Sequence, residues 1–402
     1  MESIAKQVSI IMQGSEFGDP QIKEMMTLDL KQKLTEAKAE GRPLRVYCGY
    51  DVTAPDIHLG HMVILRNMRQ FQDFGHEVTF LIGTFTTLIG DPSDRDEARS
   101  IALEETIKKN AQTYADQALK ILDPEKTKIR YNYEWLSKLS FADVISMASC
   151  FTVQQFLVRD RLRNRIENND PIWLRELLYP LAQGYDAVSL KADVQLGATE
   201  QLFNLMAGRR LQEAFGQKPQ VCLTYPVLVG TDGIQRMSKT TGNYIGVDEP
   251  PEQIYGKVMS IPDTLIMQYF ELLTDTTERE LVALGKELDN GVNPMELKKR
   301  LARDIVIQLY SDKDATEAEK HFSQVVQNKE LPDEIQEYKI SADVSVSLLV
   351  VDAGLVKSRS EAGRLINQGA VSVDGQKVTD INQQVKKDQI IKVGKRRYLK
   401  TT

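Results

Sequence analysis

The sequence predicts an α/β fold, in which a doubly wound parallel sheet carries a helical insertion and is followed by an α-helical domain and a small α+β domain. Three observations support this prediction. Two strand–helix–strand patterns lie in the first 232 residues, a charged helical pattern follows them, and short helices and strands alternate at the carboxyl end. Strand, helix and strand in close succession form a right-handed unit with parallel strands.

The first strand–helix–strand pattern lies near the amino end. Arg42–Tyr50 carries a proline near its start and continues with β-forming residues, which favours a strand. His61–Phe74 has apolar residues at helical spacing and ends before Gly75, as helices commonly do. Glu77–Gly83 is an apolar run that is typical of a buried strand.

A second pattern repeats the first after a long interval. Leu190–Leu196 and Val221–Val229 read as strands, and Leu202–Phe215 reads as the helix between them. The intervening residues, about 108–173, read as mostly helical. We therefore expect one domain over residues 1–232 with a helical insertion between its halves.

The rest of the chain divides into three parts. Residues 233–328 are expected to form a loop followed by an α-helical domain, because their pattern is helical with charged outer faces. Residues 329–344 are acidic and contain proline, which favours a linker. Residues 345–402 alternate short helices and strands around an Asp374-Gly375 turn, which predicts a small α+β domain.

The composition is that of a globular chain. Hydrophobic residues make up 42% and charged residues 27%, which does not fit a disordered protein. No apolar run reaches the roughly 20 residues that span a bilayer, and the amino terminus lacks a basic start and an apolar stretch, so a cytoplasmic location is expected. The three cysteines are widely spaced, which indicates reduced thiols and no zinc site.

Charge is distributed unevenly. The net charge of −6 argues against a protein that coats nucleic acid with its whole surface. The carboxyl end is nevertheless basic, and Asp388 is the one acidic residue among Lys386, Lys387, Lys392, Lys395, Arg396, Arg397 and Lys400. On charge alone, a solvated tail and a nucleic-acid contact are both open.

The first chemical motif lies between the first strand and the first helix. It runs from Asp51 to His61 and contains His58, Gly60 and His61 as H-L-G-H. Ligands of open α/β sheets bind at the carboxyl ends of strands, where a helix amino terminus offers N–H groups to phosphate. Two histidines without a third ligand do not favour a metal site, so no protein-held metal is expected. A histidine pair with no role stays open on spacing alone.

A second motif follows the last predicted strand of the sheet. Gly233–Thr240 is polar and begins with glycine, so it is a loop and not a core strand. Lys239 on this loop is a point charge able to reach a triphosphate. Taken alone, the segment also fits an ordinary surface loop.

A third motif places polar groups on one helix face. Tyr179 and Gln183 are four residues apart, and Asp186 is one turn further on. Gln195–Gln201 then leads out of a strand into a helix. A polar stripe on a plain amphipathic helix is the alternative.

Together these motifs resemble the class I aminoacyl-tRNA synthetases. H-L-G-H resembles their HIGH signature, and R-M-S-K-T resembles their KMSKS loop with Arg236 for the first lysine and Thr240 for the last serine. The segments around Asp186 and Glu200 resemble tyrosyl-tRNA synthetases in particular. The resemblance implies a Rossmann-like catalytic domain that activates tyrosine with ATP and transfers it to tRNA(Tyr), with Mg²⁺ held through the ATP phosphates.

The resemblance also implies site residues. The implied catalytic residues are His58, His61, Arg236 and Lys239. The implied tyrosine-binding residues are Tyr47, Asp91, Tyr179, Gln183, Asp186 and Gln201, with Tyr47 and Asp186 at the phenol hydroxyl. The implied ATP-binding residues are Asp51, Thr53, Gly60, Gly197, Glu200 and Lys239, and Arg95 and Arg99 match basic positions near the phosphates. The family more often has aspartate at position 200 and a second glycine at position 198, where this chain has Glu200 and Ala198.

The carboxyl-terminal segment resembles the αL-type RNA-binding module. Lys357, Arg359 and Arg364 fall on a helix start and one helix face, where they could meet phosphates. With the basic tail, this resemblance implies contact with the tRNA. The helical insertion resembles the family's dimer interface, which implies a homodimer.

Three alternatives remain at this point. Tryptophanyl-tRNA synthetases share the fold, but a carboxylate at Asp186 suits a phenol hydroxyl better. Small nucleotidyltransferases share H-x-G-H but not the other domains. A synthetase-derived RNA-binding protein, such as a splicing cofactor, would not need His58, His61 and Lys239.

Overall fold

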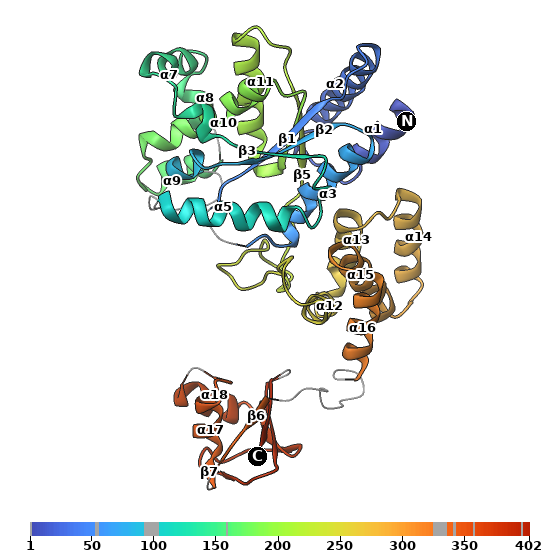
Figure 1. The fold of residues 1–402 in the computed structure, drawn as a ribbon, viewed down its shortest axis with the longest axis vertical. Coiled ribbons are helices and arrows are strands. Elements are labelled where there is room, and N and C mark those ends of the chain that lie inside the picture. Colours follow the sequence, from blue (N-terminus) through green and yellow to red (C-terminus); the bar gives the residue numbers. More distant parts are fainter. Residues whose placement is uncertain are drawn as a thin grey trace. The chain divides into compact units, whose positions relative to one another are not determined.

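The computed structural model divides the chain into two compact units, Met1–Glu319 and Lys320–Thr402 (Figure 1). It describes residues 2–52, 56–91, 104–157, 160–324, 336–340, 343–356, 358–394 and 397–402. Each unit is considered by itself below. Within the described residues, no helix has both the length and the apolar character needed to cross a membrane.

A parallel five-stranded sheet forms the centre of the first unit. Its strand order is β3-β2-β1-β4-β5, and all four neighbouring pairs are parallel. The strands are β1 (Arg45–Tyr50), β2 (Glu77–Ile82), β3 (Thr127–Tyr131), β4 (Val194–Ala198) and β5 (Val221–Tyr225). The order reverses between β1 and β4, which is where open α/β sheets bind ligands. The doubly wound fold predicted from the sequence is confirmed.

One strand was not predicted. β3 lies inside residues 108–173, which we expected to be mostly helical, and this expectation is wrong for Thr127–Tyr131. The strand is at the edge of the sheet, and its residues are half-buried or exposed. Lys128 and Arg130 alternate with less polar residues, so the segment has no apolar run to mark it.

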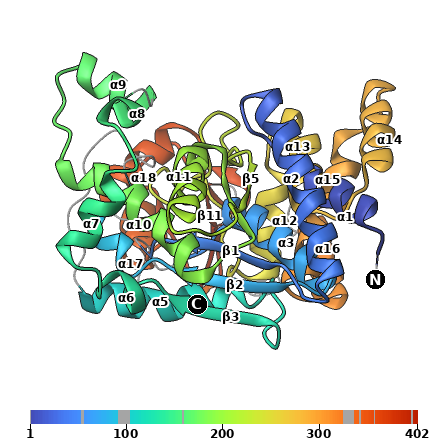
Figure 2. The ribbon, with the colours of Figure 1, turned by 90° about the horizontal axis from the view of Figure 1, so that it is seen from above.

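Helices cover both faces of the sheet. Tyr50 stacks on Phe80 and contacts the ring of His61 in α3 (Leu59–Asp73), so α3 lies on that face. Tyr47 points to the opposite face, because side chains alternate along a strand, and packs against Ala187 of α10 (Leu174–Leu190). α11 (Leu202–Ala214) packs along α10 on this second face (Figure 2).

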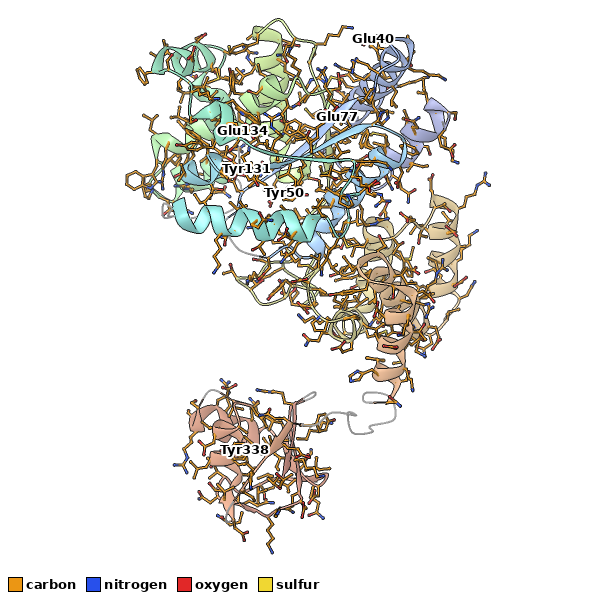
Figure 3. The ribbon with its side chains drawn as sticks, in the orientation of Figure 1. Glu40, Tyr50, Glu77, Tyr131, Glu134 and Tyr338 are labelled. Carbon is orange, nitrogen blue, oxygen red and sulfur yellow. The ribbon has the colours of Figure 1, made fainter. Side chains whose placement is uncertain are left out.

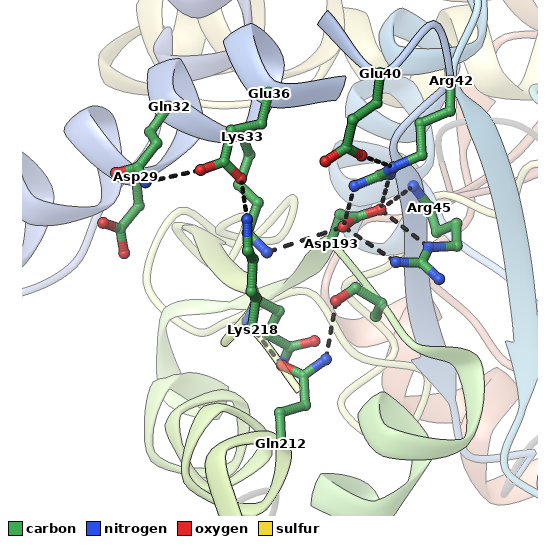
Figure 4. A network of polar contacts seen from close by, with 12 residues as sticks. Asp29, Gln32, Lys33, Glu36, Glu40, Arg42, Arg45, Asp193, Gln212 and Lys218 are labelled. Atoms are coloured by element: carbon green, nitrogen blue, oxygen red, sulfur yellow. Dashed lines mark hydrogen bonds and ion pairs between the residues drawn. The ribbon is translucent and has the colours of Figure 1, made fainter. Parts of the chain in front are cut away.

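The two edges of the sheet differ in chemistry. Asp193, directly before β4, is buried at the amino edge and accepts bonds from Arg42 at 2.8 Å and from Arg45 at 3.0 Å (Figure 4). Burial raises the pKa of Asp193, but hydrogen bonds from Arg45 and Arg42 outweigh it and hold the pKa below its ordinary value. This network fixes α2 (Pro20–Ala39), through Lys33, and the first residues of β1 and β4. The opposite, carboxyl edge, marked by Tyr50 and Tyr131 in Figure 3, is left for a site.

A helical region completes the first unit. It contains α12 (Pro251–Met259), α13 (Ile266–Leu273), α14 (Glu278–Asp289), α15 (Pro294–Leu309) and the start of α16 (Asp312–Phe322). Arg66 of α3 joins this region to the sheet domain. Its buried guanidinium donates to Leu272 O at 3.0 Å, Asp275 Oδ1 at 2.5 Å and Gln308 Oε1 at 2.7 Å.

The second unit has its own core and sheet. Two helices, α17 (Val346–Asp352) and α18 (Arg359–Asn367), accompany a sheet of order β6-β12-β11-β8-β9. The core residues include Val346, Leu349, Ile391 and Leu399. β6 (Gln336–Tyr338) pairs in parallel with β12 (Arg397–Thr401), although it lies within the segment that we expected to act as a linker. The small α+β domain predicted at the carboxyl end is confirmed.

Candidate active site

A cavity of about 210 Å³ opens at the carboxyl edge of the sheet, between β1 and β4. The structure brings many of the predicted site residues into its lining. These are Asp51, Gly60, His61, Asp91, Tyr179, Gln183, Asp186, Gly197 and Gln201. Residues far apart in the sequence therefore meet in one pocket.

Asp186 forms a polar end of this pocket. Its Oδ1 accepts a hydrogen bond from Trp135 Nε1 at 2.7 Å, and its Oδ2 accepts one from Asn132 Nδ2 at 3.2 Å. Burial raises the pKa of Asp186 from its ordinary value to about 8. The hydrogen bonds from Trp135 and Asn132 lower this pKa, whereas the charge of the nearby Asp51 raises it. Sequence reasoning missed Asn132 and Trp135, because they follow the unpredicted strand β3.

Tyr47 is buried near Asp186 and is not among the residues that line the pocket. Its ring packs among Leu81, Ala187 and Ala192, and its buried hydroxyl makes no hydrogen bond of normal geometry, although the side chain of Gln220 is near enough to lower its pKa. Burial, and after it the charge of Asp186, raises the pKa of Tyr47 well above its ordinary value. A buried hydroxyl without a partner is costly, so a ligand that bonds to it would gain more than usual.

Asp51 and Tyr179 meet at the middle of the pocket. Asp51 Oδ2 accepts from the Tyr179 hydroxyl at 3.1 Å, and its Oδ1 accepts from Thr86 Oγ1 at 2.7 Å. Gln183 is on the same face of α10 as Tyr179, and its buried Oε1 has no hydrogen-bond partner. A Cβ on Gly83 would collide with Asp51 Oδ1 and Thr86 Oγ1, so any larger residue there would displace the Asp51 carboxylate.

Asp91 and Gln201 form a further wall. Gln201 Nε2 donates to Asp91 Oδ2 at 2.5 Å, and Asn204 Nδ2 donates to Gln201 Oε1 at 2.9 Å. The second bond fixes which end of the Gln201 amide faces Asp91. Asp91 is buried and its carboxylate adds to the negative charge of Asp51 in the pocket.

His58 and His61 are held as neutral donors at the amino end of α3. His58 is the N-cap, and its Nδ1 accepts from Gly60 N at 3.1 Å. His61 Nδ1 in turn accepts from His58 N at 3.2 Å. Each Nδ1 is an acceptor, so each Nε2 carries the proton and can donate. Burial, with the neighbouring His61 and Arg236, lowers the pKa of His58 to about 2.

Gly60 lies beside the ring of His58. A Cβ added to Gly60 would lie 2.9 Å from both Cε1 and Nδ1 of that ring, so the absent side chain lets His58 cap the helix. Gly60 also lines the pocket.

The loop of the second motif carries two cations that are already paired. Arg236 Nη1 lies 3.1 Å from Glu200 Oε2, and Lys239 Nζ pairs with Asp56. Asn243, which sequence reasoning missed, organises the loop. It accepts from Ser238 N at 2.8 Å and donates to Arg236 O at 3.1 Å and to Asp232 Oδ2 at 2.9 Å.

Backbone hydrogen bonds join the first two motifs. Leu59 N donates to Ile245 O at 2.9 Å, and Val247 N donates to Ile57 O at 3.1 Å. The chain after the loop therefore lies directly against the start of α3. Lys239, through its ion pair with Asp56, also lies next to the segment that precedes α3.

Some predicted residues lie elsewhere or outside the described residues. Thr53, Arg95, Arg99 and Lys357 lie outside them. Arg359 and Arg364 are exposed on α18 of the second unit. The described residues contain no group of three or more His, Cys, Asp or Glu side chains able to hold a metal ion.

Comparison with known proteins supports the resemblance seen in the sequence. Residues 38–327 match the family described as tRNA synthetases class I (W and Y), and residues 348–391 match the S4 domain. The chain is 49% identical to the tyrosine–tRNA ligase of Carboxydothermus hydrogenoformans, covering 92% of this chain and 93% of that protein. It is 47% identical to the tyrosine–tRNA ligase of Moorella thermoacetica, and the match covers 99% of this chain and 96% of that protein.

Solved structures agree on the fold. The tyrosyl-tRNA synthetase of Archaeoglobus fulgidus, solved with L-tyrosine, has a TM-score of 0.61 at 22% identity and covers 79% of this chain and all of that one. A truncated mitochondrial tyrosyl-tRNA synthetase of Aspergillus nidulans has a TM-score of 0.63 at 19% identity, and the match covers 81% of this chain and 94% of that one.

Proposed function

This chain belongs to the class I tRNA synthetases for tryptophan and tyrosine, and from that premise we propose how its pocket works. The protein is an enzyme, a tyrosine–tRNA ligase, and it uses ATP as a substrate. We propose that it first forms tyrosyl-adenylate and pyrophosphate, and then transfers tyrosine to the 3′ end of tRNA(Tyr).

Asp186 is the observation that carries the substrate assignment. A carboxylate that already accepts from Trp135 and Asn132 is fixed in direction and faces the cavity. In the proposal, the substrate phenol donates to Asp186 and accepts from Tyr47, whose hydroxyl makes no hydrogen bond of normal geometry. Phenylalanine would offer Asp186 no further donor and Tyr47 no acceptor, and tyrosyl-tRNA synthetases are themselves the standard example of that kind of selection.

The middle of the pocket suits the α-ammonium group. In the proposal, Asp91, Tyr179 and Gln183 bind it, and Gln201 keeps Asp91 in place through their 2.5 Å bond. The buried Oε1 of Gln183 without a partner is the acceptor that a donor such as ammonium would satisfy.

The nucleotide is proposed to bind where the two motifs meet. Asp51, Thr53, Gly60 and Gly197 would contact ATP, and Glu200 would bond the ribose. The tyrosine carboxylate attacks the α-phosphorus in line, and the bond to pyrophosphate breaks, so no covalent enzyme intermediate is needed.

Residues of both motifs are proposed to stabilise the negative charge on the departing pyrophosphate. His58 and His61 donate through Nε2, and Lys239 and Arg236 supply positive charge. These four are the proposed catalytic residues. Mg²⁺ would be held through the ATP phosphates.

The second unit is proposed to bind the tRNA. Arg359 and Arg364 are exposed on α18, and Lys357 precedes that helix in the sequence. Basic side chains on one face neutralise phosphates and fix the register of the RNA. We also propose that the enzyme works in the cytoplasm, where its tRNA is charged.

A homodimer is part of the proposal. Exposed large apolar side chains gather on the helices between β3 and β4, namely Tyr133, Phe141, Ile145, Val153, Ile166, Trp173, Leu174 and Leu178. Apolar patches of this kind mark interfaces. A second copy of the chain is the proposed partner.

Exchange of pyrophosphate into ATP tests the activation step. We expect exchange with tyrosine alone among the twenty amino acids, and its loss in Asp186→Ala. Exchange with tryptophan would contradict the assignment of the pocket while keeping the fold. Absence of exchange with every amino acid would favour an RNA-binding role instead.

A further inference from the structure

The segment that carries the first motif is held from outside the sheet. It runs from Asp51 to His58, and residues 53–55 lie outside the described part. Asn110 Nδ2 of α5 (Glu104–Ala118) donates to Val52 O at 3.0 Å, and Gln117 Oε1 of the same helix accepts from Ile57 N at 2.6 Å. Both amides are buried, so each bond is made without competition from water.

A third residue of α5 contacts the same motif. Tyr114 is buried, lines the pocket and meets the ring of His61 edge-on, with the centroids 6.2 Å apart. Asn110, Tyr114 and Gln117 are spaced i, i+4 and i+7, so they share one helix face. One face of α5, the helix labelled in Figure 1, thus contacts the motif near the start of the segment, near its end and just beyond it.

The chemistry of the backbone fixes the direction of each bond. Val52 O can only accept, so Asn110 must present its NH₂ group. Ile57 N–H can only donate, so Gln117 must present its oxygen. The two amides therefore have opposite roles at the two ends of one segment.

We propose that Asn110 and Gln117 are positioning residues for the activation step, which hold Asp51 and His58 in place before ATP binds. The inference rests on the proposed function and deepens it. Neither residue reaches the substrates in this proposal, and both act through the backbone of Val52 and Ile57. Val52 and Ile57, when their backbone is held in advance, do not lose conformational entropy as the nucleotide binds, so the benefit appears in kcat/KM for ATP.

The opposite roles allow a matched test, in which each amide is changed to its acid. Gln117→Glu keeps an acceptor for Ile57 N–H, so we expect kcat/KM for ATP in tyrosine-dependent exchange to stay within about threefold of the unchanged enzyme. Asn110→Asp has no donor while ionised, and we expect a loss of at least about tenfold. The loss should shrink as the pH falls towards about 5, because the carboxyl group introduced by this substitution regains an O–H donor when it is protonated.

Two apolar variants control for charge. Gln117→Leu removes the bond to Ile57 N, and Asn110→Leu removes the bond to Val52 O, in both cases without adding a charge. Each variant should lose at least about tenfold in kcat/KM for ATP. KM for tyrosine should change little in all four variants, because Asp186, Tyr179 and Gln183 are on α10. Thermal unfolding of each variant is measured in parallel.

Several results would overturn the inference. Equal effects of Gln117→Glu and Asn110→Asp would show that bond direction is irrelevant. Normal activity of Asn110→Leu would assign the loss in Asn110→Asp to repulsion of ATP. Losses that merely follow thermal stability would reduce the residues to a structural role. Absence of exchange in the unchanged enzyme would contradict the proposed function itself, which the same assay reveals separately.

Discussion

At the scale of single residues, the pocket holds a carboxyl group where its charge is disfavoured. The pKa of Asp186 is about 8 in the folded protein, chiefly because of burial, and near 3.8 when the group is free. Between those values the folded protein binds more protons than the unfolded chain, so this group makes stability fall as the pH rises. The pocket therefore keeps a group that lowers stability, which agrees with its proposed role in binding tyrosine.

Asp186→Asn should separate these two effects. We expect the variant to be more stable than the unchanged enzyme at pH 8, by several kcal/mol, and the difference to vanish near pH 4. Tyrosine-dependent exchange should be lost at the same time. Urea unfolding across this pH range measures the first effect, and a stability difference that grew towards low pH would contradict the assigned pKa.

Asp56 offers a second test at this scale. It pairs with Lys239, a proposed partner of the pyrophosphate, so the ATP phosphates must compete with it. Asp56→Asn should lower KM for ATP about two- to fivefold, because a half-exposed ion pair contributes at most about 1 kcal/mol. Asp248→Asn, which frees Lys120 and makes the same change of charge, is the matched control. A higher KM in Asp56→Asn alone would show that Asp56 assists ATP binding.

At the scale of elements, α3 connects the pocket with the helical region. His58 caps its first turn, and Arg66, two turns on, is buried among acceptors from α13, α15 and the loop after α13. Arg66→Met should lower the free energy of unfolding by about 2–3 kcal/mol, because Leu272 O would lose its donor. Arg69→Met, on the same helix but half-exposed, should change it by less than about 0.5 kcal/mol. Denaturant unfolding compares the two, and equal effects would mean that the three bonds of Arg66 add nothing.

The elements also show what the sequence could and could not predict. β1, α3, β2, β4, α11 and β5 were found because their apolar periodicity is strong and their ends carry glycine or proline. β3 was missed because an edge strand with Lys128 and Arg130 has no such pattern. The motif residues of the pocket were predicted because short signatures carry them. Asn132, Trp135 and Asn243 were missed because single polar residues in loops become recognisable only when folding brings a partner within hydrogen-bond distance.

At the scale of the whole molecule, the exposed apolar helices are the feature to test. Phe141 is 81% exposed and Leu174 is 75% exposed, although both are large and apolar. Phe141→Asp and Leu174→Asp should each raise the dissociation constant of the proposed dimer at least about 100-fold, because a charge would be buried without a partner. Val282→Asp on α14, also at an exposed position, should leave the assembly unchanged. Sedimentation equilibrium measures this, and a monomeric unchanged enzyme would contradict the dimer.

The second unit extends beyond the span that matches the S4 domain. That match covers residues 348–391, whereas β6 and β12 lie before and after it and still belong to the sheet. Leu399 of β12 is fully buried in the core. An isolated fragment cut to residues 348–391 should therefore fail to fold, whereas one that includes both strands keeps its core intact.

The parallel pairing of β6 with β12 has a mechanical consequence. The chain from the first unit enters the sheet through β6, so tension along this chain pulls β6 lengthwise past β12. Leu399, Lys400 and Thr401 face Gln336, Glu337 and Tyr338 along this pair, and their hydrogen bonds are loaded together in shear. Bonds loaded in this way resist force better than bonds opened one after another. The pairing is thus suited to a module that must stay folded under tension along the chain.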